Sequence, residues 1–241
     1  CIERTRLWII GMQSKNGGWG SFDAENTYHY LNNIPFADHG ALLDPPTSDV
    51  SARCLSFLAQ LNRSDDKATI NKSLKYLISE QELDGSWYGR WGTNYIYGTW
   101  SVLSALNLLS FPNKKVIFEK AKNFLKSRQQ NDGGWGEDGK TYYKKFKKLV
   151  KESTPSQTSW AILGLIAAGE VKSKEVELGI KYLIKNLKKN NEWDENYHTA
   201  VGFPKVFYLK YHGYSKYFPL LAISKYSNLI FSNYQKPQFG T

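Results

Sequence analysis

The chain has 241 residues, a formal net charge of +10, and 41% hydrophobic and 15% aromatic residues. This length allows one large domain or two small ones, and the aromatic content suits a large core or an apolar cavity, because aromatic side chains bury large areas and line such cavities. No run of about 18 apolar residues is present, so we expect no helix that crosses a bilayer.

The cysteines and the runs of lysine exclude few further classes of protein. Cys1 and Cys54 lack the spacing of a disulfide framework or a zinc cluster, and a reducing compartment is the simplest interpretation. Lysines are concentrated in residues 140–151 and 184–190. A solvated helix face is the usual reason for such runs. An anionic membrane surface is the second, and nucleic acid is the third, because no recognised binding motif accompanies the charge.

A glutamine–tryptophan turn recurs along the chain. The clear copies are residues 13–19 (QSKNGGW), 81–87 (QELDGSW) and 129–135 (QQNDGGW), and a degenerate copy, 187–193 (LKKNNEW), keeps the tryptophan but not the glutamine or the glycine pair. An aromatic residue stands five positions before each copy, at Trp8, Tyr76, Phe124 and Tyr182. A fixed internal register of this kind predicts a repeat architecture.

Helical patterns stand on both sides of these turns. Amphipathic stretches precede them at residues 6–12, 70–80, 116–128 and 175–186, and further helical patterns follow at 48–61, 97–109 and 156–169. The 48–61 stretch opens with a Ser/Asp cap, and 156–169 ends on Gly169, which suits a C-cap. The 97–109 stretch is apolar on nearly all sides, which predicts an inner helix.

Strand-like alternation is scarce, so the sequence predicts an all-α toroid of inner and outer helices, incomplete within residues 1–241. The turns have a structural explanation in this fold. Their glycines allow the positive φ of a sharp helix exit, and Asp or Asn favours the turn. The glutamine amide is able to bond free groups at a neighbouring helix end. We therefore interpret Trp19, Trp87 and Trp135 as scaffold rather than catalytic residues.

Familiar catalytic motifs are absent. The sequence has no GxSxG, HExxH, P-loop or GxGxxG pattern, and its four histidines lack metal-ligand spacing. We expect neither a metal nor a cofactor.

An acidic loop at residues 35–53 is the first candidate site. In a neutral interpretation, Asp44 belongs to a rigid Asp-Pro-Pro turn and Asp49 caps a helix, with Arg53 one turn later. In a functional interpretation, these three side chains form a polar patch that faces an apolar cavity.

Aromatic clusters are the second candidate. They lie at residues 87–97 and 202–214, with Phe22 just after the first turn. Spacings of four, four and three place Phe203, Phe207, Tyr211 and Tyr214 on one stripe of a predicted helix. Such a stripe is more often core than pocket. However, aromatic faces attract cations, and a pocket walled by rings would stabilise a carbocation without quenching it.

Together these segments resemble the squalene–hopene cyclases. The resemblance covers about residues 7–226. One turn alone would be weak, since related toroids share it, but the full ordered set is specific. It consists of the repeated turns and residues 35–53, 85–98, 134–138, 153–158 and 202–204.

The resemblance implies an α6–α6 barrel fold and a monotopic membrane enzyme on the cytoplasmic face. Such an enzyme protonates squalene and runs a carbocation cascade to a pentacyclic triterpene such as hopene, without a cofactor or metal. The implied partners are squalene, a membrane surface, an N-terminal part of the same protein and a second copy in a homodimer, but no nucleic acid. The family's proton donor belongs to an Asp-x-Asp-Asp motif, which this sequence lacks. We therefore expect a C-terminal portion of a cyclase, inactive on its own.

The resemblance also assigns roles to individual residues. Asp44 and Asp49 fall on a second acidic pair that supports the acid, and Tyr97 joins their network. Arg53 stands where some members have a histidine, and a fixed cation there would strengthen the acid. The cation-stabilising aromatics match Trp91, Phe203, Phe207, Tyr211 and Tyr214, Phe22 replaces a common tyrosine, and Phe36 matches a residue at the substrate-channel constriction.

Other interpretations stay open. A fragment of an oxidosqualene cyclase of sterol synthesis is the nearest alternative, although the 35–53 loop favours the squalene type. A prenyltransferase β-subunit shares the toroid but needs zinc ligands for which no suitable set is present. A non-catalytic, aromatic-lined lipid-binding domain is the alternative from another class. The sequence does not distinguish hopene, hopanol and tetrahymanol as products.

Overall fold

The computed structural model describes residues 1–37 and 42–231. Its α-helices are α1 (Ile2–Gly11), α2 (Ser48–Leu61), α3 (Lys67–Ser79), α4 (Tyr95–Asn107), α5 (Lys114–Ser127), α6 (Pro155–Ala167), α7 (Lys174–Lys185) and α8 (Tyr214–Ile230). Short 3-10 helices are η1 (His29–Asn33), η3 (Ser64–Asp66), η4 (Gly139–Tyr142) and η5 (Lys144–Phe146). Two short strands, β1 (Ala200–Phe203) and β2 (Phe207–Leu209), form an antiparallel hairpin.

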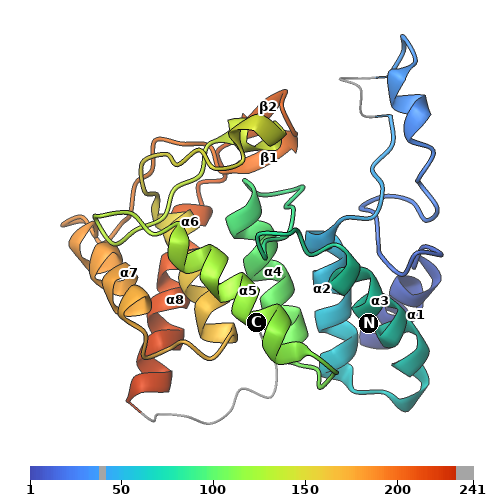
Figure 1. The fold of residues 1–241 in the computed structure, drawn as a ribbon, viewed down its shortest axis with the longest axis horizontal. Coiled ribbons are helices and arrows are strands. Elements are labelled where there is room, and N and C mark those ends of the chain that lie inside the picture. Colours follow the sequence, from blue (N-terminus) through green and yellow to red (C-terminus); the bar gives the residue numbers. More distant parts are fainter. Residues whose placement is uncertain (38–41, 232–241) are drawn as a thin grey trace.

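The helices form two layers (Figure 1). The inner helices α2, α4, α6 and α8 pack against one another in that order, and α3, α5 and α7 cover them from outside. Every residue of α6 is buried, as is nearly every residue of α4. This arrangement confirms the predicted all-α toroid and the predicted inner helix near residues 97–109.

The tryptophan of each turn is locked to the helix before it. In all four copies, the indole N–H donates to the carbonyl ten residues earlier, at 2.7 or 2.8 Å; the pairs are Trp19–Ile9, Trp87–Leu77, Trp135–Leu125 and Trp193–Leu183. The first three rings are almost fully buried. Burial of a tryptophan removes roughly 150–250 Å² from water, which is worth about 4–6 kcal/mol as an upper value.

The glutamine of each clear turn joins two successive outer helices. The Gln81 amide donates to its own turn at Gly85 and to the Ile117 carbonyl of α5, both at 3.0 Å. Gln13 and Gln129 make the equivalent bonds to Thr69 of α3 and Glu175 of α7. The turn glycines Gly17, Gly85 and Gly133 have φ near +90°, as a sharp helix exit requires. These bonds confirm the scaffold role that the sequence predicts.

One predicted helix end differs from the structure and another is confirmed. Thr47, rather than Ser48 or Asp49, is the N-cap residue of α2, and Asp49 lies in the first turn. The predicted end of 156–169 is confirmed, because α6 stops at Ala167 and Gly169 follows with φ of +87°.

The predicted helical stripe at residues 203–214 is wrong. Phe203 and Phe207 lie on opposite strands of the hairpin and are paired across it. Pro204 lacks the N–H that a helix needs, and Lys205 adopts a positive φ of 72°. Residues four apart meet across a tight turn as well as along a helix, so the spacing alone did not distinguish the two.

Candidate active site

The candidate site lies where the starts of α2 and α4 meet the hairpin. Asp44, which precedes α2, is buried, and its Oδ1 accepts a hydrogen bond from Nε of Arg90 at 3.0 Å. The other oxygen, Oδ2, is buried and has no hydrogen-bond partner among the described residues. A buried carboxylate oxygen without a donor is costly.

Asp49 is held by backbone groups from a distant segment. Its Oδ2 accepts the N–H groups of Arg90 and Trp91 at 3.0 and 2.9 Å, and its Oδ1 accepts the Thr47 hydroxyl at 2.7 Å. Burial raises the pKa of the Asp49 carboxyl, and the hydrogen bonds that it accepts offset this only in part. Asp49 therefore fixes the segment that carries Trp91 relative to α2.

Arg90 connects three parts of the chain. Besides the bond to Asp44, its Nη1 donates to the Gly202 carbonyl of the hairpin at 2.9 Å. Its guanidinium carbon lies 4.3 Å from the ring centre of Trp91 and 5.7 Å from that of Phe203. Sequence reasoning did not single out Arg90. The available signal was a single arginine inside the glycine- and aromatic-rich segment 87–97, because a buried arginine requires partners.

Aromatic rings continue from this point, and we call Phe22, Trp91, Phe203 and Phe207 the aromatic wall. The Trp91 indole N–H donates to the Ser21 hydroxyl at 2.6 Å, and the ring meets Phe22 edge-to-face at 6.1 Å. Phe203 and Phe207 meet at 5.4 Å across the hairpin. The structure thus brings together residues that the sequence predicted from three separate segments.

A second group of predicted residues lies on the adjoining side of α2 and α4. Arg53 places its guanidinium carbon 4.3 Å from the ring centre of Trp100. Tyr97 contacts Trp160 at 5.0 Å, and Tyr214 contacts the same indole at 5.8 Å. Trp100 and Trp160 stack nearly parallel at 6.1 Å. These contacts extend the site inward from Asp49 into the core.

The Tyr97 hydroxyl links the two groups electrostatically. Burial raises the pKa of Tyr97, and the charge of Asp49 raises it further. Arg53 lowers the pKa of Tyr97 through its charge and a hydrogen bond. Both Asp49 and Arg53, the other members of the predicted polar network, thus influence the pKa of Tyr97.

Two predicted residues stand apart from this site. Phe36 follows η1 on an extended arm and is 88% exposed, so the described residues do not enclose it. Tyr211 is 51% exposed and contacts Tyr214 at a ring-centre distance of 5.2 Å.

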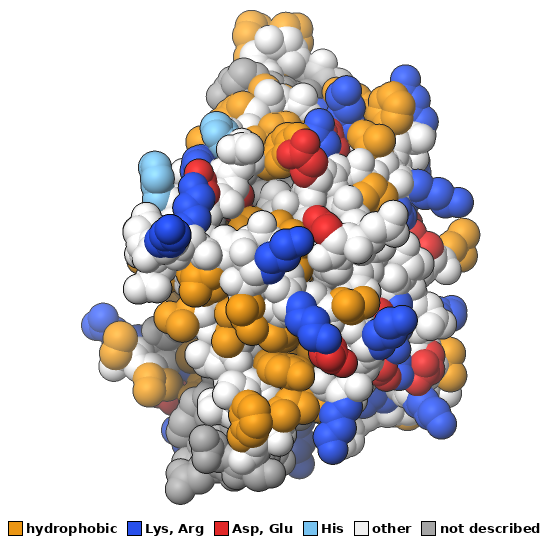
Figure 2. Space-filling model, turned by 90° about the vertical axis from the view of Figure 1, so that its left-hand side faces the viewer, with side chains coloured by type: hydrophobic (Ala, Val, Ile, Leu, Met, Phe, Trp, Pro, Cys, Tyr) orange, Lys and Arg blue, Asp and Glu red, His pale blue; other side chains and the backbone are white. Residues whose placement is uncertain are grey.

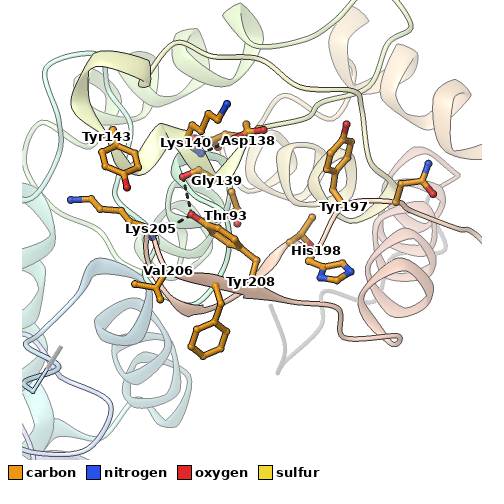
Figure 3. Close-up of a pocket in the computed structure, with 14 residues that line it drawn as sticks. Thr93, Asp138, Gly139, Lys140, Tyr143, Tyr197, His198, Lys205, Val206 and Tyr208 are labelled. Carbon is orange, nitrogen blue, oxygen red and sulfur yellow. Dashed lines mark hydrogen bonds between the residues drawn. The ribbon is translucent and has the colours of Figure 1, made fainter. Parts of the chain in front are cut away.

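A surface pocket of about 620 Å³ adjoins the hairpin (Figure 3). Tyr208 stands at its centre and bonds through its hydroxyl to the Gly139 carbonyl and the Lys205 N–H. Lys140, Tyr143 and His198 surround it. Phe207 of the aromatic wall also lines this pocket. Within residues 1–37 and 42–231, no cluster of His, Cys, Asp and Glu is arranged to hold a metal ion.

Solved structures share this fold. The apo structure of the type II terpene cyclase MstE from Scytonema has a TM-score of 0.64 and 16% identity, over 95% of this chain and 68% of that chain. The toroid is therefore the fold of the type II terpene cyclases. The sequence model described as the squalene-hopene cyclase C-terminal domain matches residues 1–228, and the chain belongs to this family.

Individual relatives agree with this assignment. The squalene–hopene cyclase of Zymomonas mobilis is 54% identical over 240 residues, which cover 98% of this chain and 36% of that protein. The squalene–hopene cyclase of Alicyclobacillus acidocaldarius is 43% identical over 92% of this chain and 35% of that protein. The dammaradiene synthase of Dryopteris crassirhizoma is 39% identical over 98% of this chain and 38% of that protein. The chain thus spans little more than a third of these relatives.

Proposed function

We propose that the protein containing this chain is a triterpene cyclase that converts squalene to a pentacyclic product such as hopene through a proton-initiated carbocation cascade. This chain contributes the acidic pair Asp44 and Asp49, the cation Arg53 and the aromatic wall. An acid from another part of the protein donates the proton. The names and extents of the relatives support this proposal.

The Oδ2 atom of Asp44, which has no hydrogen-bond partner within residues 1–37 and 42–231, carries the proposal. This oxygen is buried beside Arg90, next to the aromatic wall. A carboxylic acid placed against it would donate a hydrogen bond, and a charge-assisted bond of this kind is about twice as strong as a neutral one. The same contact would orient the acid toward the rings, whose negative faces stabilise a developing cation by about 0.5–2 kcal/mol each.

The wall also suits a cascade rather than a hydrolysis. The rings of Trp91, Phe203 and Phe207 carry no nucleophile that would trap a cation early. Their indole and phenyl faces stabilise positive charge at several points along a cavity, and catalysis requires such stabilisation where charge develops.

Conversion of squalene in detergent by the protein at its natural length tests the function. Gas chromatography with mass spectrometry should detect a cyclic triterpene, and Asp44→Asn should reduce its rate by at least about tenfold, the scale of one charge-assisted hydrogen bond. Glu177→Gln, which removes an exposed carboxylate on α7, is the matched control and should leave the rate unchanged. Squalene that is bound but unchanged would replace this proposal with a lipid-binding function. The 241-residue chain alone should be inactive.

We propose further that the protein attaches to the cytoplasmic face of a membrane without crossing it. No helix of the described residues is long and apolar enough to span a bilayer. Figure 2 shows hydrophobic side chains gathered beside lysines and arginines on one face, and α8 exposes Tyr217, Leu220 and Leu221. Flotation with anionic vesicles should exceed flotation with zwitterionic ones, given the net charge of +10. Equal recovery of the protein with anionic and with zwitterionic vesicles would contradict an electrostatic contribution to membrane attachment. The homodimer stays a prediction, which sedimentation of the detergent-solubilised protein tests.

A further inference from the structure

Arg90 makes an unusual set of contacts for one side chain. It is 8% exposed, and its partners come from the loop before α2, from its own segment and from the hairpin. A buried guanidinium is stable only when it is paired and its donors are satisfied. Asp44 supplies the opposite charge, so the pair is close to neutral.

The Arg90 guanidinium also covers one face of the Trp91 indole. It lies over one face of the indole, 4.3 Å from the ring centre. The indole N–H is engaged by Ser21, and the ring meets Phe22 at 6.1 Å with the two ring planes 79° apart. A cation–π contact needs an open ring face within about 6 Å, so the face that Arg90 covers is closed to a ligand.

The same side chain fixes the hairpin against this ring. Nη1 bonds the Gly202 carbonyl, and the guanidinium carbon lies 5.7 Å from the ring centre of Phe203. Two backbone bonds reinforce the junction: the Val201 N–H donates to the Trp91 carbonyl at 3.2 Å, and the Thr93 N–H donates to the Thr199 carbonyl at 2.9 Å. Loss of Arg90 would leave the backbone bonds and the Trp91–Ser21 bond but would remove the side chain that contacts both rings.

We propose that Arg90 is a positioning residue that sets the relative placement of Trp91 and Phe203 and closes one face of Trp91 to a ligand. The inference rests on the proposed cyclase function. Without Arg90, the side chains of Trp91 and Phe203 are no longer held where positive charge develops in the substrate. A larger share of the carbocation then loses a proton before the last ring of the product closes. The expected signature is a change in which products form, rather than a uniform loss of rate.

The test compares Arg90→Met, Arg90→Lys and Arg128→Met in the protein at its natural length. Arg128 is the matched control, because its guanidinium also lies over a ring, Phe124 at 5.2 Å, but at the end of the outer helix α5. Arg90→Met should raise the share of incompletely cyclised products by about fivefold, the scale that one cation–π contact sets. Arg90→Lys, which keeps the charge but not the planar fork, should give an intermediate share. Arg128→Met should give the parent's products.

Hydrogen exchange provides a second readout that does not depend on turnover. Arg90→Met should speed exchange of the amides in residues 199–209 and leave those of α7 unchanged. Faster exchange with an unchanged product pattern would overturn the proposal, as would no change in either measurement. A parent protein that converts no squalene would refute the proposed function, and the exchange measurement would then decide alone whether Arg90 holds the wall.

Discussion

Arg53 of α2 lies over the indole of Trp100 on α4, with its guanidinium carbon 4.3 Å from the ring centre. The contact holds a permanent positive charge beside Tyr97 and one helical turn from Asp49. A cation held in this way favours the ionised form of any nearby acid and so strengthens it.

Replacement of Arg53 should separate charge from packing. Arg53→Met should raise the pKa of the acid and lower the rate of squalene conversion by up to about tenfold for each unit of that rise. Arg53→His should retain activity at low pH and lose it as the pH rises through about 6.5, where an unperturbed imidazole loses its proton. The rate of the parent should not fall in this way with rising pH, because arginine stays charged. The measurement is the rate of the natural-length protein between pH 5 and 8, and a histidine variant with the parent's pH profile would contradict the role.

The buried carboxyl of Asp49 should make stability depend on pH. Its pKa is raised in the folded state by burial, so the folded state binds the proton more tightly and the contribution of this group to stability falls as the pH rises. Asp49→Asn should remove this term while preserving an acceptor for the two N–H groups. Relative to the parent, the variant should therefore gain stability with increasing pH, as measured by urea unfolding from pH 4 to 8.

Asp84 provides the opposite control. Burial raises its pKa, but hydrogen bonds from Ser86 and Lys147 outweigh this and lower it. The stability from Asp84 is thus present above its unfolded pKa and is lost as the pH falls. Asp84→Asn should lose stability relative to the parent as the pH rises. If the free energies of unfolding of Asp49→Asn and Asp84→Asn, each relative to the parent, changed with pH in the same direction, the opposite pKa shifts of the two carboxyls would be refuted.

The glutamine of a turn should be worth more than an ordinary surface amide. Gln81→Ala removes the bonds to Gly85 and to Ile117 of the next outer helix, so the free energy of unfolding should fall by about 1–3 kcal/mol. Asn186→Ala is the comparison, because the Asn186 amide donates to the Tyr182 carbonyl of the helix that it caps, α7. Calorimetry or urea unfolding measures both, and equal losses would show that the link between outer helices adds nothing.

Gly98 should be intolerant of a side chain. A Cβ there would lie 2.3 Å from the Trp87 carbonyl oxygen, closer than packed atoms allow. Gly98→Ala should therefore cost at least about 2 kcal/mol or prevent folding. Gly11→Ala, at a position with nothing within 4 Å, should be neutral or stabilising by up to about 1 kcal/mol. Similar stability of the two variants, measured by thermal unfolding, would show that the turn moves away from α4 at little cost.

The sequence predicted the toroid because its turns are made by local interactions. The indole of each turn bonds a carbonyl ten residues away, and the glutamine bonds its own turn. Such contacts leave a fixed register that is visible in a single sequence. The apolar character of α4 likewise follows directly from its burial.

The site was predicted less completely, because its contacts are distant in sequence. Arg90 meets Asp44 and Gly202, which lie 46 and 112 residues away, and nothing in the local pattern indicates such partners. The hairpin was mistaken for a helix because a spacing of four fits both structures. Phe36 was placed in the site by resemblance, and the described residues leave it exposed.

The ten-residue interval between each indole and its carbonyl partner has a consequence for sequence length. An insertion or deletion inside any of these intervals would detach the tryptophan from its helix. The connections that follow the tryptophans, residues 20–47, 88–94, 136–154 and 194–213, have no such constraint and differ widely in length. Most of the candidate site residues lie in these connections. Insertions and deletions are therefore tolerated mainly in the segments where they would change the shape of the candidate site.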